Sequence, residues 1–247
     1  MSVYVVTHKN YKKPEIACYK TLLVGAYKGH ILGEYVLNDD NGDNISEKNA
    51  NYCELTGLYW IWKNTNDDYA GIVHYRRYFC NSLSSKKILK EKTILKKLKS
   101  YDMIVPFRRK LKTSVLAQYC ERSGFKKDIE LTRKVISELY HEYLNDFDDV
   151  FNNNYVYFYN MFITKSNILN EYCEWLFNIL FKVEELCDIS EYDNYQKRIF
   201  GFLSERLFTV FIKYKKYKLC ETGIINTEEK HKFPKSILIA LKRFLYG

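Results

Sequence analysis

The sequence predicts an α/β domain, because three of its features are typical of that class. Short β-branched and aromatic runs alternate along the chain with longer segments of helical period. The 247 residues are enough to bury a sizeable core. Neither an internal repeat nor a low-complexity linker divides the chain. We therefore expect one domain over residues 1–229 and a basic tail over residues 230–247.

Four apolar runs predict strands. The first, residues 3–7 (VYVVT), is bounded by polar residues, and the second is residues 71–75 (GIVHY). Between them, residues 39–43 (DDNGD) predict a turn, because Asn and Asp tolerate left-handed backbone and glycine adopts it freely. The third run, residues 101–106, is stopped by its proline. The fourth covers residues 155–163.

Five segments predict helices. In the first, Ser46 is a candidate N-cap and polar residues 64–68 mark the end. One apolar face of this helix is formed by Leu55, Leu58, Tyr59 and Trp62. The polar run 145–154 predicts a loop. The other helical segments are residues 86–99, 128–144, 166–187 and 192–214.

The basic surplus favours an anionic partner. The chain has 39 Lys and Arg against 30 Asp and Glu, a net charge of +9. Nucleic acid, a phosphate-bearing small molecule and an anionic membrane surface all fit that sign. An aromatic share of 17% excludes disorder. No apolar run approaches the roughly 18 residues of a membrane span, and the N-terminus lacks the pattern of a secretory signal, so we expect a cytoplasmic protein.

Several chemistries are disfavoured because their motifs are missing. The seven cysteines form no C-x-x-C pair, so we expect reduced cysteines packed as small apolar residues rather than a zinc cage or a disulfide framework. The sequence holds no P-loop, G-x-G-x-x-G turn, G-x-S-x-G elbow or H-E-x-x-H pair. A kinase, an NAD enzyme, a serine hydrolase and a zincin are therefore disfavoured.

The tract HYRRYF, residues 74–79, stands where a hydrophobic strand runs out. Ligands of open α/β sheets bind beyond the carboxyl ends of the strands. Arg76 and Arg77 would offer planar, charged forks that match phosphate oxygens, with Tyr75 beside them. The alternative is a sheet edge whose arginines face solvent. His74 is a candidate for proton transfer or, alternatively, a hydrogen-bonded structural group.

A second candidate anion site is the segment 44–49, which leads into the first helix. Free N–H groups and the positive end of the helix dipole make a helix N-terminus attractive to anions. Asn44, Ser46 and Glu47 are the candidate ligand contacts. The alternative for Glu47 is a plain capping carboxylate.

A carboxylate held against apolar surroundings is what a general base needs. Glu205, on an otherwise apolar helix, is the first candidate, and Asp43 and Glu54 are its rivals. Arg198 lies seven positions before Glu205 and shares its helix face, so a structural ion pair is the alternative.

Two acidic tracts are candidate metal sites. Asp146-Phe147-Asp148 has the D-x-D pattern by which many nucleotide-sugar transferases hold Mn²⁺ or Mg²⁺, hard ions that prefer oxygen ligands. It lies in a predicted loop rather than after a strand, so a solvated turn is the alternative. Asp39 and Asp40 form the second tract. No metal ligand and no cofactor is assigned, and dependence on Mn²⁺ or Mg²⁺ stays open.

The tail, residues 230–247, is basic and amphipathic. This pattern is typical of segments that lie on anionic bilayers. An ordinary terminal helix docked on the body of the protein is the alternative.

Six tracts resemble a bacterial family labelled domain of unknown function 4422. The resemblance runs from about residue 3 to residue 213, and its most specific tract is HYRRYF. The tail falls outside it. The tracts are YVVTH (4–8), DNISEKNANYCELTGLYWIWKN (43–64), GIVHYRRYF (71–79), YDMIVP (101–106), NMFI (160–163) and GFLSER (201–206).

The resemblance implies a glycosyltransferase of capsule, exopolysaccharide or O-antigen clusters. It also implies a GT-A-like fold, with a mixed central sheet flanked by helices and a C-terminal helical part. Such an enzyme would move a hexosyl residue, galactose-type donors being among those proposed, from a UDP-sugar to a growing or undecaprenyl-linked glycan. In other GT-A families a comparable strand ends in D-x-D. Here it ends in residues 74–77 (HYRR), which places arginines where a metal ion would bind.

The resulting hypothesis assigns residues to the binding of the sugar donor. Thr7 and His8 approach the nucleotide, and Arg76 and Arg77 face the diphosphate. Residues 44–47 line the donor pocket. Cationic forks would stabilise the charge that develops on the departing diphosphate.

On the acceptor side, a carboxylate takes the proton of the attacking hydroxyl, and Asn160 and Arg206 are further candidates. The tail would hold the enzyme peripherally at the inner face of the cytoplasmic membrane. The alternative function is a non-enzymatic nucleic-acid-binding module, which is disfavoured because the basic residues are spread along the chain.

Overall fold

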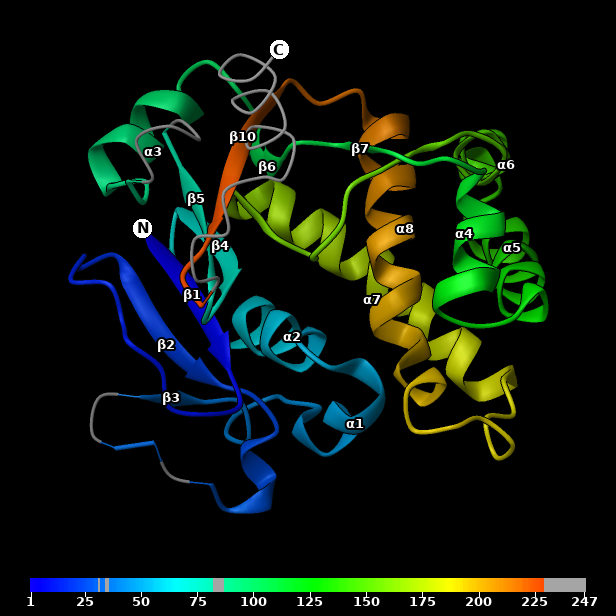
Figure 1. The fold of residues 1–247 in the computed structure, drawn as a ribbon, viewed down its shortest axis with the longest axis horizontal. Coiled ribbons are helices and arrows are strands. Elements are labelled where there is room, and N and C mark those ends of the chain that lie inside the picture. The colour runs from blue at the N-terminus through cyan, green and yellow to red at the C-terminus, as the bar shows by residue number, and fades with distance from the viewer. Residues whose placement is uncertain (31, 34–35, 82–86, 229–247) are drawn as a thin grey trace, which may run out of the picture.

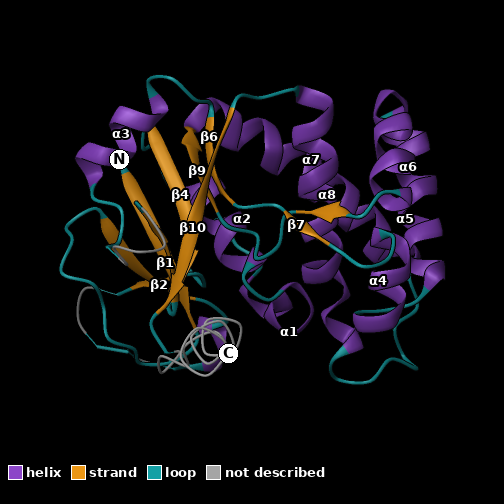
Figure 2. Cartoon of the chain, turned by 45° about the horizontal axis from the view of Figure 1, so that its top comes forward, coloured by secondary structure: helices purple, strands orange, loops and turns teal. Residues whose placement is uncertain are grey.

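The computed structural model describes residues 1–30, 32–33, 36–81 and 87–228. The predicted tail over residues 230–247 lies outside the described residues. Within them, a sheet occupies one side of the molecule and a body of helices the other (Figures 1 and 2). The described part holds no helix that is both long and apolar enough to cross a membrane.

Eight strands form one mixed sheet in the order β3-β2-β1-β4-β5-β10-β6-β9, and β4 also pairs with β9. A separate ribbon joins β7 (Arg109–Lys110) to β8 (Tyr155–Val156). The strands of the large sheet are β1 (Ser2–Thr7), β2 (Tyr19–Leu23), β3 (Leu37–Asn38), β4 (Tyr69–His74), β5 (Arg77–Cys80), β6 (Met103–Pro106), β9 (Phe162–Lys165) and β10 (Leu219–Asn226).

The parallel part of the sheet determines where ligands can approach. β1 lies between β2 and β4 and is parallel to both, so the carboxyl ends of the three strands meet at one edge. At that edge, Tyr75 and Arg76 form a two-residue turn into β5. His74 and Arg77 therefore face each other across an antiparallel pair.

Alternation along β1 supplies apolar side chains to both faces of the sheet. Val3 and Val5 belong to one core cluster, which includes residues of α3 (Glu91–Leu98), whereas Tyr4 and Val6 belong to the other. Every residue of β1 is buried, as is typical of parallel strands covered on both sides.

The larger core cluster lies between the sheet and three helices, namely α2 (Leu55–Asn64), α7 (Ser166–Leu186) and α8 (Ile199–Lys215). An outer helical layer packs on α7 and α8, on the side away from the sheet (Figures 1 and 2). It consists of α4 (Val115–Arg122), α5 (Lys126–Leu139) and α6 (Leu144–Asn152). The short α1 (Asn49–Tyr52) precedes α2.

The structure confirms the mixed α/β class and most of the predicted elements. Strands at residues 3–7, 71–75 and 101–106 correspond to β1, β4 and β6, and the helix at 166–187 is α7. The seven cysteines are free. Cys120 is exposed, however, rather than packed as a small apolar residue.

Three predicted boundaries are wrong. Residues 128–144 do not form one helix, because α5 ends at Leu139 and a 3₁₀ turn precedes α6. The predicted loop 145–154 is largely α6, whose buried Phe147, Val150 and Phe151 join the core. The last long helix begins at Ile199 instead of residue 192.

Three further predictions need correction. Residues 155–163 do not form one strand, because β8 and β9 are separated by Tyr159 and Asn160 in left-handed backbone. The helix expected over 86–99 is formed only over α3. Ser46 is not an N-cap, because its hydroxyl donates to Asp39 Oδ1 (2.5 Å) instead of accepting from the helix.

Candidate active site

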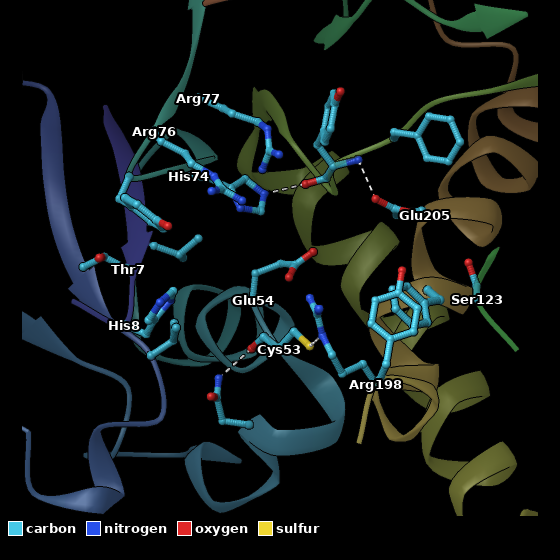
Figure 3. A pocket seen from close by; sticks show the side chains of 18 of the residues that line it. Thr7, His8, Cys53, Glu54, His74, Arg76, Arg77, Ser123, Arg198 and Glu205 are labelled. Carbon is cyan, nitrogen blue, oxygen red and sulfur yellow. Dashed lines mark hydrogen bonds between the residues drawn. The ribbon is translucent and has the colours of Figure 1, made fainter. Parts of the chain in front are cut away.

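A cavity of about 650 Å³ opens at the carboxyl ends of β1, β2 and β4. The sheet edge forms one wall, and residues of α4 and α8 form the opposite wall, where Ser123 and Glu205 lie in Figure 3. This is the place where open α/β sheets bind ligands. We take it as the candidate active site.

Thr7 and His8 reach the cavity from the end of β1. The Thr7 hydroxyl is engaged locally, because it donates to the Lys9 carbonyl (2.6 Å) and accepts from the Lys9 N–H (3.2 Å). The His8 ring lies edge-on to Tyr75, with centroids 5.5 Å apart. Burial lowers the pKa of His8, and the nearby Lys9 and Arg76 charges lower it further, so His8 is a neutral contact at pH 7.

Arg76 and Arg77 enter the cavity from the hairpin between β4 and β5, with both guanidinium groups turned inward (Figure 3). The buried Nε of Arg76 has no hydrogen-bond partner among the described residues. Its Nη1 lies 3.5 Å from Glu228 Oε2. Arg77 lies over the ring of Tyr159 (4.6 Å) and forms no ion pair with a described carboxylate. The two guanidinium groups therefore face one cavity with N–H donors that are available to a ligand.

His74 is tied to the backbone. Its Nε2 lies 2.6 Å from the carbonyl oxygen of Tyr159, and because a carbonyl can only accept, Nε2 carries the proton. Burial lowers the pKa of His74, Glu54 and the hydrogen bond to the Tyr159 carbonyl oppose that fall, and the Arg77 and Arg76 charges add to it. His74 is therefore neutral at pH 7 and holds the Tyr159 carbonyl in place.

The left-handed pair Tyr159 and Asn160 connects the polar groups of the cavity. Tyr159 has φ 84° and Asn160 has φ 49°, and such backbone costs about 1–3 kcal/mol for a bulky residue. The Tyr159 N–H donates to Glu205 Oε1 (2.8 Å), while Asn160 Nδ2 donates to Glu54 Oε1 (2.8 Å). With His74 on the Tyr159 carbonyl, this strained turn positions three titratable side chains.

Glu205 combines burial with specific partners. Its Oε2 accepts from Arg206 Nη1 (2.9 Å). Burial raises the pKa of Glu205, the Glu54 charge adds to that rise, and Arg206 and the Tyr159 N–H oppose it. Such a carboxyl has the environment of a general base. The alternative pairing with Arg198 does not form, because Arg198 Nε donates to Cys53 Sγ (3.1 Å).

Comparisons with known proteins agree with this architecture. A family model described as Domain of unknown function (DUF4422) matches residues 2–216. The chain belongs to the DUF4422 family. Among solved structures, the apo structure of WbbM, a bifunctional glycosyltransferase, is similar with a TM-score of 0.83 and 29% sequence identity over 92% of this chain. The DUF4422 chain spans 45% of WbbM. No curated protein matches it.

Five predicted residues of the DUF4422 chain do not line the cavity, and four of them belong to the segment 43–47. Asp43 accepts from the Tyr59 hydroxyl (3.0 Å), and Asn44 closes a turn by accepting from the Ser46 N–H (3.1 Å). Ser46 is buried against Asp39, and Glu47 is exposed. The following helix α1 contributes Asn49 and Ala50 to the lining instead.

The other predicted residues meet at the cavity or beside it. Thr7, His8, His74, Tyr75, Arg76, Arg77, Glu205 and Arg206 line it, as does the rival carboxylate Glu54. Asn160 lies directly behind, where it binds Glu54.

The acidic tracts proposed as metal sites are engaged elsewhere. Asp39 is buried and accepts from two backbone N–H groups and Ser46, while Asp40 is exposed. On α6, Asp146 pairs with Lys213 (3.1 Å) and Asp148 with Arg133 (2.7 Å). In the described ranges, no group of three or more His, Cys, Asp or Glu is arranged to hold a metal ion.

The sequence interpretation missed most of the far wall. Gln118 lies on α4 and Ser123 directly follows this helix, which was not predicted. Tyr195 precedes the 3₁₀ turn Gln196–Arg198. The sequence could have indicated Phe202 as a cavity residue, because it lies four residues after Arg198 and therefore shares the helix face that leads to Glu205.

Proposed function

We propose that this DUF4422 protein is a glycosyltransferase that uses a nucleotide-activated sugar. The observation that carries the proposal is the placement of Arg76 and Arg77, side by side at the mouth of the parallel strands, with donor groups that no described residue satisfies. The similarity to WbbM supports it. A GT-A-like arrangement fits the mixed sheet and is part of the proposal.

The donor binds against the sheet edge. Arg76 and Arg77 hold the two phosphates, and Thr7 and neutral His8 lie toward the nucleoside. The forks stabilise the negative charge that grows on the diphosphate as it leaves, a task for which other enzymes use a metal ion. The uridine base and a galactose-type hexose are what the family resemblance implies for the donor.

In the proposed sugar transfer, Glu205 is the general base. The acceptor hydroxyl gives its proton to Glu205, and its oxygen forms the new bond to the anomeric carbon. The bond from that carbon to the diphosphate oxygen breaks, and its electron pair leaves with the nucleotide. A raised carboxyl pKa suits this role near neutral pH. The acceptor is a lipid-linked or growing surface polysaccharide, and an anionic membrane surface is proposed as the partner of the tail.

A thermal-shift panel tests this function. UDP-galactose, UDP-glucose, UDP-N-acetylglucosamine and UDP are added with Mn²⁺ or with EDTA, and stabilisation should rise as RT ln(1 + [L]/Kd) for a ligand of the native state. We expect one sugar donor and UDP to stabilise the protein in EDTA as well. Salt-sensitive stabilisation by oligonucleotides, without any effect of the nucleotides, would overturn the proposal in favour of nucleic-acid binding.

A further inference from the structure

We propose that the far wall of the cavity, between α4, the turn Gln196–Arg198 and α8, is a separate subsite for the terminal pyranose ring of the acceptor. Tyr195 and Phe202 form its stacking surface, and Gln118 and Ser123 bind its hydroxyl groups. The inference rests on the proposed function, because it names the substrate of the same site.

The stacking surface combines the exposed Tyr195 with the half-buried Phe202. The Tyr195 side chain is 51% exposed although it lines the cavity, and its ring centre lies 5.0 Å from that of Phe202. Arg198 lies over both rings, at 5.8 and 5.4 Å. Pyranose rings present apolar C–H faces, and aromatic side chains with one polar end are suited to cover such a face. A sugar ring is therefore a ligand class that fits these two aromatic rings.

The polar contacts are oriented in advance by a buried cation. Arg206 is 1% exposed, and its Nη2 donates to Gln118 Oε1 (2.7 Å) and to Ser123 Oγ (3.2 Å). Both acceptors are thus occupied by Arg206. The Gln118 amide N–H₂ and the Ser123 hydroxyl proton have no partner among the described residues and line the cavity. Arg206 Nε is buried without a partner in the described part of the chain, and such a group costs stability.

The subsite is distinct from the donor wall. In Figure 3, Thr7, His8 and the two hairpin arginines lie on one side, and Ser123 and Glu205 on the other. Glu205 is bound to Arg206, so the proposed base lies beside the polar groups that would hold the acceptor. A ring stacked on Tyr195 would then present a hydroxyl between Glu205 and the donor.

The test separates acceptor binding from donor binding. Nucleotide release from UDP-sugars is measured with and without n-octyl glycosides of galactose, glucose and N-acetylglucosamine, and glycoside contact is followed by saturation-transfer NMR. We expect Tyr195→Ala to raise the acceptor KM about five- to tenfold, in line with the worth of an aromatic contact, with the donor KM and acceptor-free hydrolysis unchanged. Gln118→Ala should also raise the acceptor KM, whereas Tyr195→Phe should resemble the wild type.

Tyr27→Ala is the matched control, because Tyr27 is also exposed (41%) but lies outside the cavity. An acceptor KM that is unchanged in Tyr195→Ala, a donor KM that rises equally, or a wild type that contacts no glycoside would overturn the subsite. If instead the wild type neither binds nor hydrolyses any UDP-sugar, the proposed function itself is wrong.

Discussion

Replacing Arg206 by methionine should destabilise the protein strongly. The Arg206 side chain is 1% exposed and donates to Phe202 O (2.9 Å), Glu205 Oε2 (2.9 Å), Gln118 Oε1 (2.7 Å) and Ser123 Oγ (3.2 Å). Breaking a buried ion pair from one side costs about 3–5 kcal/mol, because the remaining charge is left uncompensated. For a domain of this size, that lowers the thermal midpoint by about 6–20 °C.

The pH dependence of this loss has a defined sign. Arg206 lowers the pKa of Glu205, which burial raises above its ordinary value, so the substitution raises that pKa further. When the pKa of a carboxyl such as Glu205 is higher in the folded protein than in the unfolded chain, folding favours its protonated form. The stability that this form contributes is lost as pH rises through the pKa of the folded state. The deficit of Arg206→Met should therefore be smaller near pH 4 and grow toward pH 7.

Urea and thermal unfolding of Arg206→Met, Glu205→Gln and the double variant measure these effects. In the double variant no unpaired charge remains, so we expect it to regain much of the stability that Arg206→Met loses. A fall of less than about 1 kcal/mol in Arg206→Met, or a double variant that is the sum of its parts, would refute the buried ion pair as described.

Three further predictions concern the cavity and the sheet. Glu54→Gln removes a charge that raises the pKa of Glu205, so the acidic limb of the kcat/KM profile should move to lower pH; a shift to higher pH contradicts this. Glu228→Gln frees Arg76 from a half-exposed ion pair worth about 0.2–1 kcal/mol, so calorimetry at low salt should show UDP binding tighter by about 1.4- to 5-fold, and weaker binding would count against the diphosphate site. Gly71→Ala places a Cβ 2.6 Å from a side-chain carbon of β9, so the free energy of urea unfolding should fall by about 1–3 kcal/mol; an unchanged value would show that the strands can separate.

Elements with one dominant physical signal could be predicted from the sequence. β1 and β4 are short, uninterrupted apolar runs because they are covered on both faces. α6 could not, because its Asn and Asp content suggested a loop. Its acidic side chains face outward to partners from distant segments, among them Lys213. β10, which is only half-buried, gives no clear periodic pattern.

The two walls of the site also differ in how far the sequence predicts them. Arg76 and Arg77 were predictable because adjacent charges follow a buried strand, and the end of a strand has a known place in a parallel sheet. Gln118 and Ser123 carry no local signal. In the fold, Arg206, more than eighty residues later in the chain, binds both of them, and this relation exists only after folding.

Isothermal titration of UDP into the wild type, Arg76→Ala and Arg77→Ala tests the central claim most directly. Each variant loses charge-assisted hydrogen bonds worth about 1.5–3 kcal/mol, so we predict affinity lower by about 10- to 150-fold, with the exposed-arginine control Arg108→Ala unchanged. Affinities of both hairpin variants that equal the wild-type value would contradict the account, because the diphosphate would then bind elsewhere.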